Sequence, residues 1–176
     1  MKQLIVGILA GIFLLFSANT ASALISVMAD VPVSHAFTAA GSPSTSAKGT
    51  KLGVSFLVGL ALEKYAVTSE EPGATGEYAV SMYDIFISPP IPFINVTLGA
   101  GVGKGEFNQQ HPLYNKYSPT PHTQLFMTVG YPIFGILDLH VGMHKISGKA
   151  KPKPGSGVPE FDASARMYTL GASLGF

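Results

Sequence analysis

The sequence predicts an all-β protein: a closed, antiparallel, up-and-down β-barrel that spans a membrane with eight strands. Three observations support this prediction. Apolar side chains alternate with small or polar ones, with a period of two, along most of the chain after residue 24. Charged residues make up 12% of the chain, against about 25% in an ordinary soluble domain. No segment after residue 24 offers the roughly 18 consecutive apolar residues of a membrane-spanning helix.

The N-terminus has the pattern of a cleavable secretory signal peptide. Lys2 supplies a short basic region, residues 4–16 form an apolar run, and residues 21–23 (Ala-Ser-Ala) resemble a cleavage site. The apolar run is shorter than the about 20 residues that a transmembrane anchor needs, which favours the signal peptide. We therefore expect residues 1–23 to be removed and residues 24–176 to form a single β-barrel domain.

The content of charged residues and cysteine excludes several classes of protein. Without Lys2, the chain holds 10 Lys and Arg (11 less one) against 10 Asp and Glu, so it is formally neutral. It carries no basic stripe of the kind that binds nucleic acid. The absence of cysteine excludes a lipid-anchoring cysteine, a disulfide framework and a thiolate metal site. We expect no nucleic-acid partner and no cofactor.

Alternating segments predict the individual strands. The first strand is expected over residues 25–36 and the last over residues 161–176. Between them lie two hairpins, whose paired segments are 77–88 with 93–106, and 122–131 with 136–147. These six segments leave one further apolar stretch, residues 50–67, to be assigned.

The stretch over residues 50–67 has two interpretations. One long strand would continue the unbroken alternation from Leu52 to Leu62 and would give seven strands. A hairpin that turns near Val58-Gly59 would give eight, and single-chain bacterial barrels have even strand numbers. The hairpin would also bring charge at both of its ends to the same wet side of the membrane. These charged residues are Lys48, Lys51, Glu63 and Lys64. We therefore predict the hairpin.

The strand faces and the connectors favour a membrane barrel over a soluble fold. Water-facing positions of a soluble sandwich usually carry Lys, Glu and Thr, whereas the polar faces here carry mostly Gly, Ser, Thr and Asn. Short proline-containing turns, 88–92 and 131–135, also alternate with longer polar connectors, as in outer-membrane barrels. The longer connectors are 38–50, 69–76, 108–121 and 147–160. A soluble exported β-sandwich or lipocalin-like binder is the alternative.

The final residues, Thr-Leu-Gly-Ala-Ser-Leu-Gly-Phe, resemble the C-terminal assembly signal of bacterial outer-membrane β-barrel proteins. Thr169, Gly171, Leu174 and Phe176 occupy its polar, glycine and two hydrophobic positions. The resemblance is to the small, eight-stranded outer-membrane barrels as a class. It implies residence in the outer membrane of a Gram-negative-type bacterium and recognition of the last strand by the barrel assembly machinery.

Three titratable residues on one strand face, Asp138, His140 and His144, form the candidate interior cluster. A carboxylate beside an imidazole can orient it for base catalysis or for metal binding. Buried polar groups need hydrogen-bond partners whatever their function, however. We therefore interpret the three residues as a polar network inside the barrel. The other histidines fall at loops or strand ends, so we assign no metal ion.

A run of alternate lysines, Lys149, Lys151 and Lys153, predicts a basic loop. Such a loop can face the anionic phosphates of lipopolysaccharide. A solvated loop whose lysines and prolines discourage edge pairing is the alternative. Arg166 is expected at the outer end of the last strand, where its side chain can reach the headgroups.

These features predict a non-enzymatic outer-membrane barrel with a structural or surface-loop role, or with a narrow conduit. Its expected partners are outer-membrane lipid, lipopolysaccharide and the assembly machinery. A lipid-modifying barrel enzyme is the alternative, and a resemblance to lipid A deacylases would require a histidine and a serine close together on a lipid-facing strand. Ser34-His35 is the nearest pair, but it lacks the His-x-Ser-Asn spacing. Alternation with Val31 and Val33 predicts that His35 faces lipid.

Overall fold

A computed structural model describes most of the chain after residue 24. The described residues are 25–39, 42, 45–69, 76–89, 91, 93–108, 114–133 and 136–176. The predicted signal peptide, residues 1–23, lies outside them. Within the described part of the chain, no helix combines the length and the apolar character needed to cross a membrane.

The strands follow one another along the chain with short or moderate connections. They are β1 (Ser26–Phe37), β2 (Thr45–Ser55), β3 (Gly59–Ser69), β4 (Glu77–Ile87), β5 (Asn95–Phe107), β6 (Thr120–Ile133), β7 (Leu137–Ala150), β8 (Phe161–Asp162) and β9 (Ala165–Gly175). One 3-10 helix, η1 (Tyr114–Lys116), precedes β6.

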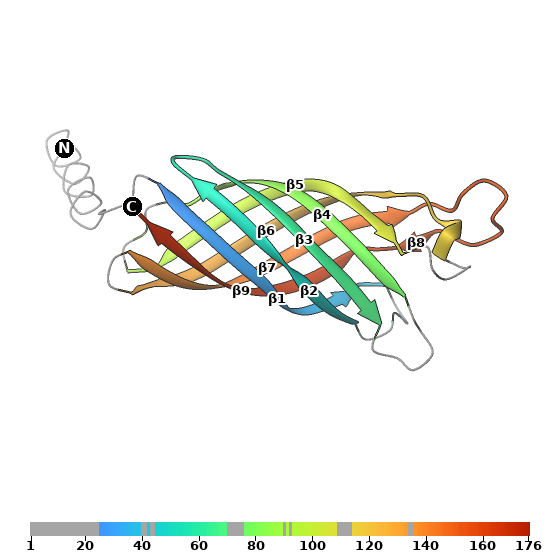
Figure 1. Cartoon of the computed structure of the whole chain (residues 1–176), viewed down its shortest axis with the longest axis horizontal. Coiled ribbons are helices and arrows are strands. Elements are labelled where there is room, and N and C mark those ends of the chain that lie inside the picture. Colours follow the sequence, from blue (N-terminus) through green and yellow to red (C-terminus); the bar gives the residue numbers. More distant parts are fainter. Residues whose placement is uncertain are drawn as a thin grey trace, which may run out of the picture.

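All of these strands except β8 form a closed antiparallel barrel of eight strands. Strands β1 to β7 pair in chain order, β7 pairs with β9, and β9 pairs with β1, which closes the ring. Figure 1 shows the strands inclined to the long axis of the barrel. Because a closed sheet has no edge, its backbone groups are paired without help from water. The predicted eight-stranded up-and-down barrel is confirmed.

The stretch over residues 50–67 is a hairpin, as predicted. Strand β2 ends at Ser55, β3 begins at Gly59, and these two residues are opposite each other in the register. At Gly59 a side chain would overlap the ring of Phe86 on β4, so any larger residue beside the turn would displace that ring. One long strand, and with it a seven-stranded barrel, is excluded.

Several strands extend further than the apolar alternation predicts. Strand β2 begins at Thr45, inside the connector predicted over 38–50, and β7 continues to Ala150. The last strand, predicted over 161–176, is split into β8 and β9. Apolar alternation marks only the part of a strand that contacts lipid, whereas strand pairing continues beyond it with polar side chains. The predicted connectors were therefore too long at this end of the barrel.

The two ends of the barrel differ in their connections. The tight β2–β3 connection and both ends of the described chain lie at one end, where Phe176 N–H donates to Ile25 O at 2.9 Å. The β1–β2, β3–β4, β5–β6 and β7–β8 connections lie at the other end (Figure 1). Outer-membrane barrels have short periplasmic turns and longer extracellular loops. We call the two ends the periplasmic end and the outer end accordingly.

The outward-facing surface of the strands is apolar. On β7, for example, Leu139, Val141 and Met143 are exposed, while the residues between them are buried. The same pattern holds around the barrel. Exposed apolar residues on other strands include Val27, Val31, Leu52, Val54, Leu60, Ile85, Val102, Leu125, Val129 and Leu170. A soluble sandwich would bury these rows between two layers, so that alternative is wrong.

The interior of the barrel is layered. Near the outer end it is filled by the outer apolar layer, a cluster of buried hydrophobic side chains. Its members are Tyr65, Val67, Tyr78, Val80, Met82, Ile146, Ala163, Ala165 and Met167. A smaller apolar cluster, Met28, Ala61, Phe86 and Phe126, lies toward the periplasmic end. The barrel also buries charged and polar side chains, which are described next.

A charged network in the barrel interior

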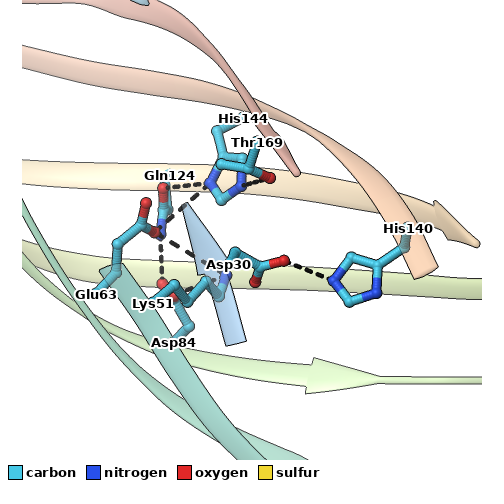
Figure 2. Close-up of polar contacts among 8 residues, drawn as sticks. All are labelled: Asp30, Lys51, Glu63, Asp84, Gln124, His140, His144 and Thr169. Atoms are coloured by element: carbon cyan, nitrogen blue, oxygen red, sulfur yellow. Dashed lines mark hydrogen bonds and ion pairs between the residues drawn. The ribbon is translucent and has the colours of Figure 1, made fainter. Parts of the chain in front are cut away.

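Polar side chains from all around the barrel meet in its interior, and we call them the interior network; all of them are buried except Asn95, which is exposed at the start of β5. Its members are Asp30, Lys51, Glu63, Asp84, Asn95, Gln124, Asp138, His140, His144 and Thr169. Figure 2 shows eight of them pointing toward one another from different strands. Strand register produces this convergence, because Lys51 on β2 lies opposite both Asp30 on β1 and Glu63 on β3.

Lys51 is the only buried Lys or Arg among the described residues, and it organises one half of the network. Its Nζ lies 2.9 Å from Asp84 Oδ2 and 4.0 Å from Glu63 Oε2. It also lies 3.1 Å from the ring centroid of Phe126, which is a cation–π contact. A buried ammonium is costly unless it is paired. Two carboxylates and one aromatic face meet that requirement here.

The amide of Gln124 links the two carboxylates to a histidine. Its Nε2 donates to Asp84 Oδ1 at 2.6 Å and to Glu63 Oε2 at 2.8 Å. Its Oε1 is 3.1 Å from His144 Nδ1 and can only accept, so Nδ1 carries a proton. In the neutral ring, Nε2 then accepts the hydroxyl proton of Thr169 at 3.4 Å. One amide thus orients three titratable side chains.

A second group, nearer the periplasmic end, is built on His140. Its Nδ1 lies 2.8 Å from Asp138 Oδ1, and its Nε2 lies 2.5 Å from Asp30 Oδ1. Both ring nitrogens therefore face carboxylate oxygens, and Asn95 Nδ2 donates to the other oxygen of Asp138 at 2.8 Å. Two such contacts require either an imidazolium that donates from both nitrogens or a protonated carboxyl group. In either state, this group holds one proton beyond a neutral imidazole and two carboxylates.

Glycines on the interior face leave room for these side chains. A Cβ at Gly101 would overlap the carboxylate of Asp84, and one at Gly171 would overlap both Asp30 and His140. The glycines of the polar strand faces thus leave the space that the charged side chains occupy inside the barrel.

The three candidate cluster residues lie inside the barrel but divide between the two groups. Asp138 and His140 bind each other, whereas His144 belongs to the group around Lys51. Sequence reasoning did not assign Lys51 or Glu63 to the interior, because it placed both on a wet side of the membrane. That expectation was wrong: they are 1% and 2% exposed. Strands β2 and β3 continue past them toward the outer end, so both charges lie in mid-strand.

His35 also departs from the prediction that it faces lipid. It is 5% exposed, and its Nδ1 lies 3.0 Å from the hydroxyl of Thr45. The register between β1 and β9 shifts between Pro32 and Ser34. A bulge of this kind adds one residue and reverses the faces that follow it. Ser34 is therefore exposed while His35 points inward, and the two side chains do not share the lipid-facing surface.

The segment that carries the alternate lysines, residues 149–160, projects beyond the barrel at the outer end (Figure 1), and we call it the basic loop. Lys149 Nζ lies 3.7 Å from Glu160 Oε1, and Lys153 Nζ donates to Asn115 Oδ1 at 3.1 Å. Backbone hydrogen bonds tie the loop to the last residue of η1 and to the segment after it. These are Ser118 N–H to Lys151 O at 3.0 Å and Lys153 N–H to Lys116 O at 2.7 Å.

The base of the basic loop carries acidic as well as basic groups. Asp162 on β8 is opposite Lys149 on β7. Hydrogen bonds from the side chain and the backbone N–H of Ser164 lower the pKa of Asp162 from its ordinary value. Lys149 thus has acidic neighbours, whereas Lys151 is exposed without one in the described part of the chain.

The residues of the predicted assembly signal lie on β9 and just beyond it, where β9 closes the barrel against β1. Thr169 and Gly171 face the interior, whereas Leu174 and Phe176 are exposed at the periplasmic end. Tyr131 and Phe93, near the short connections of the same end, are exposed as well. Exposed aromatic side chains at this level are typical of the interfacial girdle of outer-membrane barrels.

The fold and its surface now define the class of protein. A closed barrel with aliphatic rows outside and paired charges inside is suited to a bilayer and not to water. The protein is a small integral β-barrel of the bacterial outer membrane.

Comparison with solved structures agrees with this class. The chain is similar in fold to Neisserial surface protein A, with a TM-score of 0.65 and 12% identity over 88% of this chain and 99% of that one. It is also similar to the Escherichia coli outer membrane protein W (TM-score 0.50, 13% identity, 88% and 98% covered) and to the outer membrane protein AlkL (0.50, 10%, 88% and 90%). At these identities the likeness shows the fold alone. No family model and no curated protein sequence matches the chain.

Proposed function

We propose that the protein is a closed, non-enzymatic outer-membrane barrel that holds a structured basic loop at the cell surface, where the loop meets lipopolysaccharide. The observation that carries this proposal is the filling of the interior. Side chains of the outer apolar layer and of the interior network are buried at successive levels of the same barrel. An eight-stranded barrel is only wide enough for such side chains to fill it.

The outer apolar layer argues against a conduit for ions. Met82, Ile146 and Met167 are buried in it, and these apolar side chains offer a hydrated ion no group to replace its water. The interior network by itself would offer polar groups to an ion, but it does not extend through the outer apolar layer. We therefore expect the barrel to be closed.

The lipid-modifying enzyme is less well supported. Its best candidate pair, Ser34 and His35, is divided between the outer surface and the interior by the bulge in β1. His144 and Thr169 form a base–hydroxyl contact, but both are buried where a lipid substrate has no access. Incubation of the purified protein with lipid A tests this alternative, and a change in the mass of the lipid would support it.

We also infer that residues 1–23 direct export and that Thr169, Gly171, Leu174 and Phe176 are read by the barrel assembly machinery. The position of β9, which must pair with both β7 and β1 to close the ring, supports a role late in assembly. Replacement of Phe176 by Ala should lower the amount of folded protein in outer-membrane fractions. An unchanged amount would contradict the assigned role.

Planar-bilayer recording tests the closed barrel. The full chain, inserted at levels at which a porin gives clear current steps, should leave the membrane silent. Reproducible current steps from the wild-type protein would overturn the closed-barrel proposal. A filled interior supports the first result because no continuous water path is expected.

Single-cysteine labelling tests the placement of the basic loop, because the chain contains no cysteine of its own. A membrane-impermeant maleimide added to intact cells should label Pro154→Cys, an exposed position in the basic loop. It should not label Val58→Cys, which lies in the β2–β3 connection at the periplasmic end and is exposed to a similar reagent only after cell lysis. The reverse labelling pattern would overturn the proposed orientation.

A further inference from the structure

Two cations lie directly opposite each other on the outer wall of the barrel. Lys145 on β7 and Arg166 on β9 are paired in the register, and both side chains are exposed on the outward face. Residues opposite each other in an antiparallel pair have Cβ atoms about 5 Å apart, and like charges at such positions destabilise a sheet. A pair of this kind is favourable only when an anion lies between the two cations.

The described part of the chain supplies no such anion. No acidic group there forms an ion pair with Lys145 or Arg166, in contrast to two other exposed lysines of the outer wall. Lys104 lies 2.8 Å from Glu106, and Lys149 lies 3.7 Å from Glu160. The residues opposite the pair on the flanking strands are apolar: Leu125 on β6 and Ala36 on β1. The counter-charge must therefore come from outside the barrel.

The outward surface on the periplasmic side of Lys145 and Arg166 is apolar, which indicates that the anion belongs to a lipid. Toward the periplasmic end, the next outward pair in the same two strands is Met143 with Tyr168, and the one after it is Val141 with Leu170. All four of these side chains are exposed. The two cations thus lie at the outer border of a continuous apolar strip, where acyl chains give way to headgroups in the outer half of the bilayer.

We propose that Lys145 and Arg166 bind a phosphate group of lipid A, the lipid part of lipopolysaccharide, with an acyl chain lying along Met143 and Tyr168. The guanidinium of Arg166 offers a planar fork that matches two phosphate oxygens, and the ammonium of Lys145 adds a point charge beside it. The proposal rests on the proposed function, in which the outer end of this barrel meets lipopolysaccharide. It assigns the contact to the barrel wall, separate from the basic loop.

Binding of diphosphorylated lipid A to the full-length protein in detergent micelles tests this site. Each exposed cation near an anionic membrane surface contributes enough that Lys145→Gln or Arg166→Gln should weaken binding about fivefold, and the double variant about 25-fold. Lipid A stripped of both phosphates should bind the wild type as weakly as the double variant binds intact lipid A. Lys104→Gln is the matched control, and it should leave the affinity unchanged. Cold versus boiled gel mobility verifies that each variant is folded.

Three results would overturn the site. The first is a folded double variant that binds lipid A as tightly as the wild type. The second is equal binding of phosphorylated and dephosphorylated lipid A to the wild type. The third is inorganic phosphate competing at the same concentration as lipid A, which would make this a site for free phosphate and not for the lipid.

A second set of variants separates this site from the basic loop. If replacement of Lys149, Lys151 and Lys153 by Gln abolishes lipid A binding while the double variant keeps it, the wall site fails and the proposed function of the loop stands. If the wild type binds no lipid A, both fail. Loss of binding in the double variant with binding retained in the loop variant supports the wall site.

Discussion

The outer apolar layer and the interior network fill neighbouring parts of one barrel by opposite chemistry. In the outer apolar layer, side chains such as Val80 and Met167 need only volume and contact. In the interior network, each charged atom needs a particular partner, as Lys51 needs Asp84. The same pattern of alternation produces both. The same barrel backbone therefore accommodates either kind of interior. The free energy that a substitution costs depends on whether its neighbours are apolar side chains or paired charges.

The largest expected effect comes from placing a charge in the apolar layer. Val80 is 3% exposed and lies opposite Tyr65 and Gly105 in the register. Val80→Asp would bury a carboxylate in the outer apolar layer, none of whose members is a cation, which costs more than about 4 kcal/mol and should prevent folding. Cold versus boiled gel mobility measures the folded fraction. Val80→Ala removes the side chain without adding charge and should still fold; a folded Val80→Asp would contradict the assignment of this layer.

Removal of the buried cation should have the next largest effect. Lys51→Met leaves Glu63 and Asp84 without their counter-charge and should lower the free energy of unfolding by about 3–5 kcal/mol. Urea unfolding in lipid vesicles measures it. The triple variant that adds Glu63→Gln and Asp84→Asn should recover much of the loss, because no charge is then left unpaired. If the triple variant is no more stable than Lys51→Met alone, charge pairing is not what holds this group together.

A smaller effect is expected where a glycine makes room for the network. Gly101→Ala would push against the carboxylate of Asp84, and overpacking of this kind costs about 1–3 kcal/mol. Gly53→Ala is the matched control, since its new methyl group meets the flexible side chain of Met28 at 2.9 Å and the Ala61 Cβ at 3.0 Å, whereas the Cβ at Gly101 would overlap a carboxylate oxygen of Asp84. The same unfolding measurement should rank Gly101→Ala as clearly less stable than Gly53→Ala. Equal stabilities would show that the Asp84 side chain can move aside without loss of stability.

The smallest effect is expected for a polar contact made by Tyr78, a member of the outer apolar layer. The hydroxyl of Tyr78 lies 2.6 Å from His122 Nε2. Tyr78→Phe removes this hydrogen bond and keeps the ring packed against Phe107, so it should cost about 1 kcal/mol. A cost as large as that of Lys51→Met would mean that the outer end also depends on specific polar pairing, and the contrast between the two layers would be lost.

The sequence was a good guide to the strands and a partial guide to the interior. Alternation over residues 137–144 correctly separated Leu139 and Val141, which face lipid, from Asp138 and His140, which face inward. It misled at His35, where one inserted residue in β1 exchanged the two faces. The sequence also misled at Lys51 and Glu63, because charged side chains are expected in contact with water and these two are buried. The period of two itself indicates an interior position for both residues. Lys51 shares a strand face with Gly53, and Glu63 shares one with Ala61.

By itself, the sequence determined that this chain forms strands and, apart from the segment around His35, which rows face lipid. These properties follow from the period of two, which is local and is written in consecutive residues. The tertiary structure alone decided which buried groups meet. Lys51 finds Asp84, and His140 finds Asp30, across strands that are distant in the chain, because strand tilt and register in a closed barrel set the level of each side chain. The opposition of Lys145 and Arg166 was decided in the same way, by the register of β7 against β9.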